Sequence, residues 1–219
     1  MKYIISETQF VHLIESDIID FDLTVNTFAE IIWKQVKKYR QVKNKNEFLA
    51  ERIYWHINNA VRQFSERPPR FVSKNVADIF IYLFPGKNPF DFFYARHRQN
   101  LQNKSGLGPF MTWEHTTPVN QLVKELLEAN NLSQIQNYLR FYSGASWVTI
   151  QEENCLRTSG YSLKRPEGWR QAYYSCGISP LSKNQHKFYE KEKLENYSEE
   201  EFEIIKHMYK DFFKKYRKG

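Results

Sequence analysis

An acidic residue and a histidine stand side by side at Glu114 and His115, at the end of the short apolar run 110–113. Hydrolysis of a phosphodiester bond needs a general base to deprotonate water and a cation to neutralise charge on the scissile phosphate. In an ideal strand, neighbouring side chains point to opposite faces. Both residues therefore serve one site only if the strand ends or bends here. Pro118 and the helical pattern after it predict such a bend.

The run from Glu114 to Pro118 resembles the HNH, or ββα-metal, nuclease family, in which a hairpin strand carries an acidic residue, then His and, commonly two residues later, Pro. The resemblance spans roughly residues 105–137. It implies that His115 is the general base and that Glu114 binds Mg²⁺ or Mn²⁺. It also implies that Asn131 and Asn137 complete the metal site with Glu114. The alternative is a structural strand-to-helix corner, in which His115 caps backbone groups and Glu114 faces water.

Basic residues recur along the chain and give it a net charge of +7, and 16% of its residues are aromatic. Lys and Arg neutralise phosphates and aromatic rings stack on bases, so this composition suits a nucleic-acid partner. We expect DNA, with RNA as the alternative. The other interpretation of each basic segment is a solvated surface. The candidate contacts are Lys37, Lys38, Arg96, Arg98, Lys164, Arg165, Trp169 and Arg170.

Hydrophobic periodicity predicts the elements that position these residues. Residues 24–66 read as two helices, the first capped by Thr24 or Asn26 with an apolar face at Phe28, Ile31, Ile32 and Val36. Residues 118–129 have a clear helical stripe behind Pro118. Residues 144–150 read as a short strand, 75–84 as either a helix or a strand, and 198–217 as a helix that begins at a capping box.

The predicted fold class is α+β, mainly helical, with a small hairpin or short sheet around residues 105–150. We expect a basic, mainly helical region at residues 1–103 and a site-bearing region at 104–219, or both packed as one domain. "KSGLG", residues 104–108, is the expected connector and could also supply the hairpin turn.

The chain has only two cysteines, Cys155 and Cys176, which are too few for a disulfide framework or a four-thiolate zinc site. We expect both as buried thiols. The N-terminal segment lacks the basic start and unbroken apolar run of a secretory signal, and no apolar run approaches the ~20 residues of a membrane span. These features predict a cytoplasmic protein that does not associate with membranes.

Three hypotheses about function follow. The first is a metal-dependent endonuclease acting on DNA, of the restriction or phage-defence kind. The second is a non-enzymatic nucleic-acid-binding protein that uses the same basic and aromatic segments. The third is a helical protein-interaction module. If the target is a palindrome, two-fold symmetry predicts a homodimer.

Overall fold

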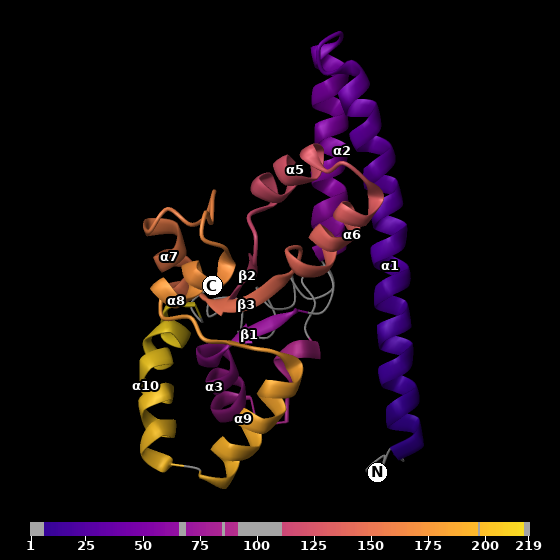
Figure 1. Cartoon of the computed structure of the whole chain (residues 1–219). Coiled ribbons are helices and arrows are strands. Elements are labelled where there is room, and N and C mark those ends of the chain that lie inside the picture. The colour runs from indigo at the N-terminus through magenta and orange to yellow at the C-terminus, as the bar shows by residue number, and fades with distance from the viewer. Residues whose placement is uncertain (1–6, 66–68, 85, 92–110, 197, 217–219) are drawn as a thin grey trace. The chain divides into compact units, whose positions relative to one another are not determined.

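The computed structural model of the chain describes residues 7–65, 69–84, 86–91, 111–196 and 198–216 (Figure 1). It is mainly helical and contains a four-stranded mixed sheet, which confirms the predicted α+β class. The chain forms two compact units: a helical unit of residues 1–61 with 123–142, and a sheet unit of residues 62–122 with 143–219. The boundary expected between residues 103 and 104 lies outside the described residues and stays a prediction.

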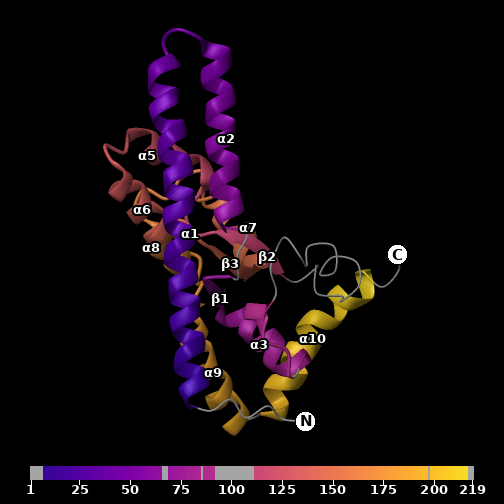
Figure 2. The ribbon, with the colours of Figure 1, turned by 90° about the vertical axis from the view of Figure 1, so that its right-hand side faces the viewer.

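The helical unit contains α1 (Glu7–Val42), most of α2 (Glu47–Ser65), most of α5 (Val119–Glu128) and α6 (Leu132–Phe141). Helices α1 and α2 lie side by side and run in opposite directions (Figures 1 and 2). Helix α1 begins far before the cap expected at Thr24, because no Gly or Pro interrupts residues 7–42. Ile31, expected on the apolar face, is 48% exposed. The buried stripe of α1 is instead Val25, Ala29, Ile32 and Val36.

Polar contacts join α1 to the other helices of this unit. Arg40 donates from Nη2 to the carbonyl oxygens of Leu127 (2.6 Å) and Ala129 (2.7 Å), at the C-terminal end of α5. The last carbonyls of a helix lack intrahelical partners, and a cation is favourable at that end of the helix dipole. Arg140 on α6 forms an ion pair with Asp22 on α1 at 2.9 Å. The apolar stripe of α1 is therefore supported by specific polar links at both α5 and α6.

The sheet has the strand order β2 (Met111–His115), β3 (Ala145–Thr149), β1 (Phe71–Ser73), β4 (Pro180–Leu181). Strand β3 is antiparallel to β2 and parallel to β1, and β4 is antiparallel to β1. The expected strand at residues 144–150 is thus confirmed as β3, and the structure adds that it lies beside β2. The hairpin turn expected at residues 105–108 lies outside the described part of the chain.

Each face of the sheet is covered by helices. Helix α3 (Lys74–Leu83) packs with Val72 and Trp147 on one face. On the other face, α7 (Ile150–Thr158) and α8 (Trp169–Ser175) pack with Val148, Leu156 and Tyr173. The ambiguous segment 75–84 is helical, and its first turn is capped by Ser73, whose Oγ accepts from the amide of Val76.

Two helices near the C-terminus, α9 (Lys183–Glu195) and α10 (Glu199–Tyr216), pack on α3 below the sheet (Figure 1), and a short 3-10 turn, η1 (Pro89–Asp91), lies nearby. The Tyr189 hydroxyl donates to Asp78 of α3 at 2.6 Å, and the Tyr82 hydroxyl donates to Glu201 of α10 at 2.7 Å. Helix α10 begins as predicted, with the hydroxyl of Ser198 accepting from the Glu201 amide.

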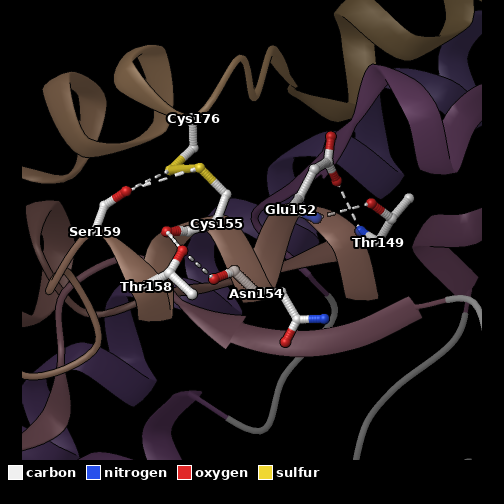
Figure 3. The surroundings of a disulfide bond; sticks show 7 residues. All are labelled: Thr149, Glu152, Asn154, Cys155, Thr158, Ser159 and Cys176. Carbon is white, nitrogen blue, oxygen red and sulfur yellow. Dashed lines mark hydrogen bonds between the residues drawn. A yellow bond between two sulfur atoms is a disulfide. The ribbon is translucent and has the colours of Figure 1, made fainter.

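A disulfide joins Cys155 in α7 to Cys176, the residue that follows α8 (Figure 3). The expectation of two buried thiols is therefore wrong. The two helices pack on the same sheet face and place the Cα atoms 5.7 Å apart, within the range that a disulfide spans. Such bonds persist mainly in oxidising compartments, so the bond lends no support to the predicted cytoplasmic location, which stays a prediction.

Replacing both cysteines with serine is expected to lower the free energy of unfolding by about 2–4 kcal/mol, because the bond closes a loop between residues 21 apart in sequence. Urea denaturation with and without a thiol reductant would measure the change. The reductant should bring the wild-type protein close to the double variant and leave the variant unaffected. A urea midpoint of the wild-type protein that does not change with the reductant would contradict the prediction.

Candidate functional site

The Glu-His pair lies where β2 ends. Glu114 is paired with Ser146 and His115 with Ala145 of β3. Beyond the strand the Thr116 amide donates to the carbonyl of Gly144, after which the chain turns and α5 starts. The Pro118 carbonyl accepts the first helical hydrogen bond, from Leu122. The bend that the sequence predicts after the pair is therefore present.

Because of this bend, both side chains line one small cavity in the sheet unit. Its volume is about 160 Å³, enough for a few water molecules at about 30 Å³ each. Arg62, near the C-terminal end of α2, brings a positive charge to the cavity, and Asn120, in the first turn of α5, brings an amide. The remaining lining residues are Pro118, Val119, Ser162 and Leu163.

Arg165 holds the end of β2 in place from inside the fold. Its side chain is 1% exposed and forms an ion pair with the Glu114 carboxylate. Its Nη1 also donates to the carbonyl oxygens of His115 and Thr116, both at 2.5 Å, and its guanidinium lies over the Tyr173 ring at 5.4 Å. A single buried cation thus contacts the Glu114 carboxylate, the backbone at the end of β2 and the Tyr173 ring of α8.

The ion pair sets the electrostatics of Glu114. Burial raises the pKa of this carboxyl above its ordinary value, and the positive charge of Arg165 opposes that rise. Glu153, in the first turn of α7, adds negative charge nearby and raises the pKa further. Glu152, the residue before Glu153, is bonded to other groups: its carboxylate accepts from the Thr149 amide at 2.7 Å and from Asn75 at 2.9 Å.

His115 is a neutral imidazole at physiological pH. Burial, together with the positive charges of Arg62 and Arg165, lowers its pKa from 6.5 to about 4. A neutral imidazole can accept a proton, and the nearby arginines supply positive charge. The cavity therefore combines a base, a carboxylate and cationic groups.

The low pKa of His115 predicts a pH-dependent stability. Its folded pKa lies below its unfolded pKa, so the unfolded chain binds more protons between pH 6.5 and 4. The free energy of unfolding therefore falls as pH falls through this window, by up to about 3 kcal/mol. His115→Gln removes the titrating group. The wild type should therefore lose stability relative to this variant as pH falls from 6.5 to 4. Urea denaturation of both proteins at several pH values would test this; a constant difference would contradict it.

The structure describes both asparagines that the HNH resemblance adds to the metal site. Asn131 and Asn137 belong to the helical unit, whereas Glu114 belongs to the sheet unit. Asn131 is the N-cap of α6 and accepts from the Gln134 amide at 2.9 Å, and Asn137 is exposed on that helix. Within the described ranges, no three His, Cys, Asp or Glu side chains are grouped to hold a metal ion.

The predicted nucleic-acid contacts that the structure describes belong to both units. Lys37 and Lys38 are exposed on α1, in the helical unit. In the sheet unit, Lys164 and Arg170 are exposed and Trp169 is half-buried. Arg165 differs from the expectation. It is buried, and its side chain donates to Glu114 and to three backbone carbonyls, those of His115, Thr116 and Tyr161, so it does not belong to an exposed basic surface. Arg96 and Arg98 lie outside the described residues.

Sequence reasoning missed Arg62 and Asn120 as parts of the cavity. Arg62 lies on a predicted helix far from Glu114 in sequence, and no local pattern distinguishes it from Arg52, the other arginine of that helix. Asn120 follows the corner within the first turn of a predicted helix, where it reads as a solvent-facing residue. Only the packing of the sheet unit brings both to His115.

Comparison with known proteins found no matching family model, no similar curated protein and no similar solved structure. The helices that the structure describes include none with the length and apolar character needed to cross a membrane. The inference about function therefore depends on the site itself.

Proposed function

We propose that the protein is a nuclease that hydrolyses phosphodiester bonds, with DNA as its substrate. The observation that carries the proposal is the cavity lined by Glu114, His115 and Arg62. It holds a neutral base next to a cation in a space suited to water and a phosphate group. The net charge of +7 and the resemblance of residues 114–118 to the HNH motif support a nucleic-acid substrate.

In the proposed reaction, His115 is the general base. The neutral imidazole takes a proton from water as the water oxygen attacks phosphorus. The bond from phosphorus to the leaving sugar oxygen breaks, and that oxygen takes a proton from solvent. Arg62 offsets the negative charge that builds on the phosphate oxygens. Arg165 is a positioning residue, because it holds Glu114 and the backbone of His115 from within the core.

A pKa of about 4 makes His115 a weak base in the free protein. A bound phosphate changes this, because a negative charge beside an imidazole favours its protonated form and raises its pKa. The same phosphate offsets the charge of Arg62, one of the groups that lower this pKa. Substrate binding would thus strengthen the base at the moment it is needed.

The HNH resemblance implies a divalent cation at Glu114, and this remains part of the proposal to be tested. Mg²⁺ in nucleic-acid enzymes commonly binds one or two carboxylates and completes its coordination with water and substrate phosphates. Glu114 is the carboxylate lining the cavity, and it already accepts from Arg165. No step above depends on the metal.

The ion pair of Glu114 with Arg165 favours a second candidate, a nucleic-acid-binding protein without activity. In that case the pair is a structural contact at a strand-to-helix corner, and His115 is a half-buried neutral side chain. The same exposed arginines and lysines would then bind phosphates without cleavage.

The test is incubation of supercoiled plasmid and labelled single-stranded RNA with the purified chain, with Mg²⁺, with Mn²⁺ and with EDTA. Cleavage of DNA that the His115→Ala variant lacks would support the proposal, and its response to EDTA would decide the metal requirement. Intact substrates together with a salt-sensitive gel shift would overturn the nuclease and favour the binding protein. If the protein neither cleaves nor binds the nucleic acids, the result would favour a protein partner.

A further inference from the structure

Four side chains of the sheet unit form a continuous stack that the proposed reaction does not use. The Arg70 guanidinium lies over the Phe71 ring at 5.6 Å, and Phe71 packs against Trp169 with ring centroids 4.9 Å apart. The Arg170 guanidinium lies over Trp169 at 5.3 Å. Two arginines from distant parts of the sequence are thus held on one pair of packed aromatic rings.

The two arginines of this stack repel each other. Both are exposed, and the pKa of Arg70 is lowered by burial of part of its side chain and by the charge of Arg170. Cation–π contacts hold guanidinium groups over the faces of aromatic rings. Two fixed positive charges near each other produce a local potential that favours an anion, and phosphate oxygens match the planar donors of Arg.

Arg70, at one end of the stack, lies at the same end of the strands as the cavity. The Arg70 amide donates to the Ala145 carbonyl at 2.8 Å, and Ala145 is paired with His115. The Arg70 side chain crosses Gly144, where an added Cβ would lie 3.0 Å from its Cδ and 3.5 Å from the Thr116 hydroxyl. The absence of a side chain at Gly144 therefore leaves room for Arg70 beside the end of β2.

The spacing of strands gives the distance from the cavity. Strands β2 and β1 are separated by β3, and neighbouring strands lie about 4.8 Å apart, so the two lie roughly 10 Å apart. This is about three times the rise of one nucleotide along a duplex strand. A nucleic-acid backbone that enters the cavity at His115 can therefore reach Arg70 within a few nucleotides.

We infer that Arg70 and Arg170 together bind a backbone phosphate of the nucleic acid, a few nucleotides from the phosphate in the cavity. The inference rests on the proposed nucleic-acid substrate and names a contact for it. Trp169 is occupied by Phe71, Tyr173 and Arg170, so its indole is a support for the arginine rather than a platform for a base. The site therefore recognises phosphate and not base sequence.

The test is binding of fluorescein-labelled DNA, as a dinucleotide and as an oligonucleotide of about eight residues, measured by anisotropy in EDTA. The longer DNA should bind the wild-type protein more tightly than the dinucleotide, because it also reaches the arginine pair. Arg70→Gln and Arg170→Gln should each weaken binding of the longer DNA by about tenfold. The double variant should lower the slope of log affinity against log salt by about 0.7, the value for one single-strand phosphate.

Arg157→Gln is the matched control, because Arg157 is exposed on α7 and bonded to Asn154 at 2.9 Å, outside the stack. Arg70→Lys and Arg170→Lys keep the charge and should lose less affinity than the Gln variants. If the Gln variants bind no more weakly than Arg157→Gln, or if the longer DNA gains nothing over the dinucleotide, the inference is wrong.

Failure of this inference is distinguishable from failure of the nuclease. Anisotropy in EDTA measures binding whether or not the protein cleaves DNA. Loss of binding in the Gln variants of a protein that cleaves nothing would support the phosphate site and overturn the enzyme. Cleavage that depends on His115, with unchanged binding in both Gln variants, would support the enzyme and overturn the phosphate site. If the protein binds an RNA of the same length instead of DNA, and both Gln variants weaken that binding equally, the phosphate site would be supported and the substrate would be RNA.

Discussion

Arg165→Met is expected to lower the free energy of unfolding by about 3 kcal/mol or more, the largest effect on stability that we expect from one substitution. The reason is the carboxylate left behind: Glu114 has a 20% exposed side chain, and removing one member of a largely buried ion pair leaves an uncompensated charge. The His115 and Thr116 carbonyls lose a donor as well. Urea denaturation at neutral pH would measure the change.

A double variant separates the charge from the packing. Glu114→Gln combined with Arg165→Met removes both charges, so it should be more stable than Arg165→Met alone. Lys164→Met is the matched control, since Lys164 is the exposed neighbour of Arg165 and surface changes usually stay within about 0.5 kcal/mol. Equal stability of Arg165→Met and Lys164→Met would show that the buried pair does not hold the site.

His115→Ala is expected to slow DNA cleavage by about 10² to 10⁴ fold, the usual contribution of a general base. The loss should be mainly in kcat, because the imidazole acts on the proton of water and not on the part of the substrate that binds. The variant should retain binding to labelled DNA in EDTA through the exposed arginines and lysines. Initial rates on a plasmid substrate, together with anisotropy, would give both quantities.

His56→Ala is the control for this experiment, because His56 is an exposed histidine on α2 and its removal should leave cleavage intact. The His115→Gln variant keeps the approximate size of the side chain without a base of similar strength. It should be as inactive as His115→Ala while remaining better packed. Substantial cleavage by His115→Gln would exclude the general-base role.

The corner at Glu114 and His115 could be predicted because its signals are local. Pro118 and the apolar stripe behind it indicate the start of a helix, and the short apolar run before Glu114 indicates a strand. The strand after Gly144 was equally clear. The start of α1 was missed because residues 7–23 carry no cap that stands out, and a helix continues through such a segment when nothing breaks it.

The roles of individual charges could not be predicted from local patterns. Arg165 and Arg170 stand in one basic, aromatic segment and look alike in sequence. In the structure Arg165 is buried against Glu114 and Tyr173, while Arg170 is exposed over Trp169. The two cysteines are a similar case, because their spacing of 21 residues does not reveal that α7 and α8 pack side by side.

Local sequence patterns were thus sufficient to predict the α+β class, the helix that follows Pro118, and Glu114 and His115 as candidate site residues. Each of these predictions depends on residues near one another in the chain. The cavity depended on tertiary structure, since Arg62, which lines it, and Arg165, which pairs with its Glu114, each lie about fifty residues away in sequence, one on either side. The stack of Arg70 with Arg170 likewise exists only because β1 and α8 meet on one face of the sheet. Burial and pairing of charges are properties of three-dimensional packing, and they decide which arginine supports the fold and which one is available to a phosphate.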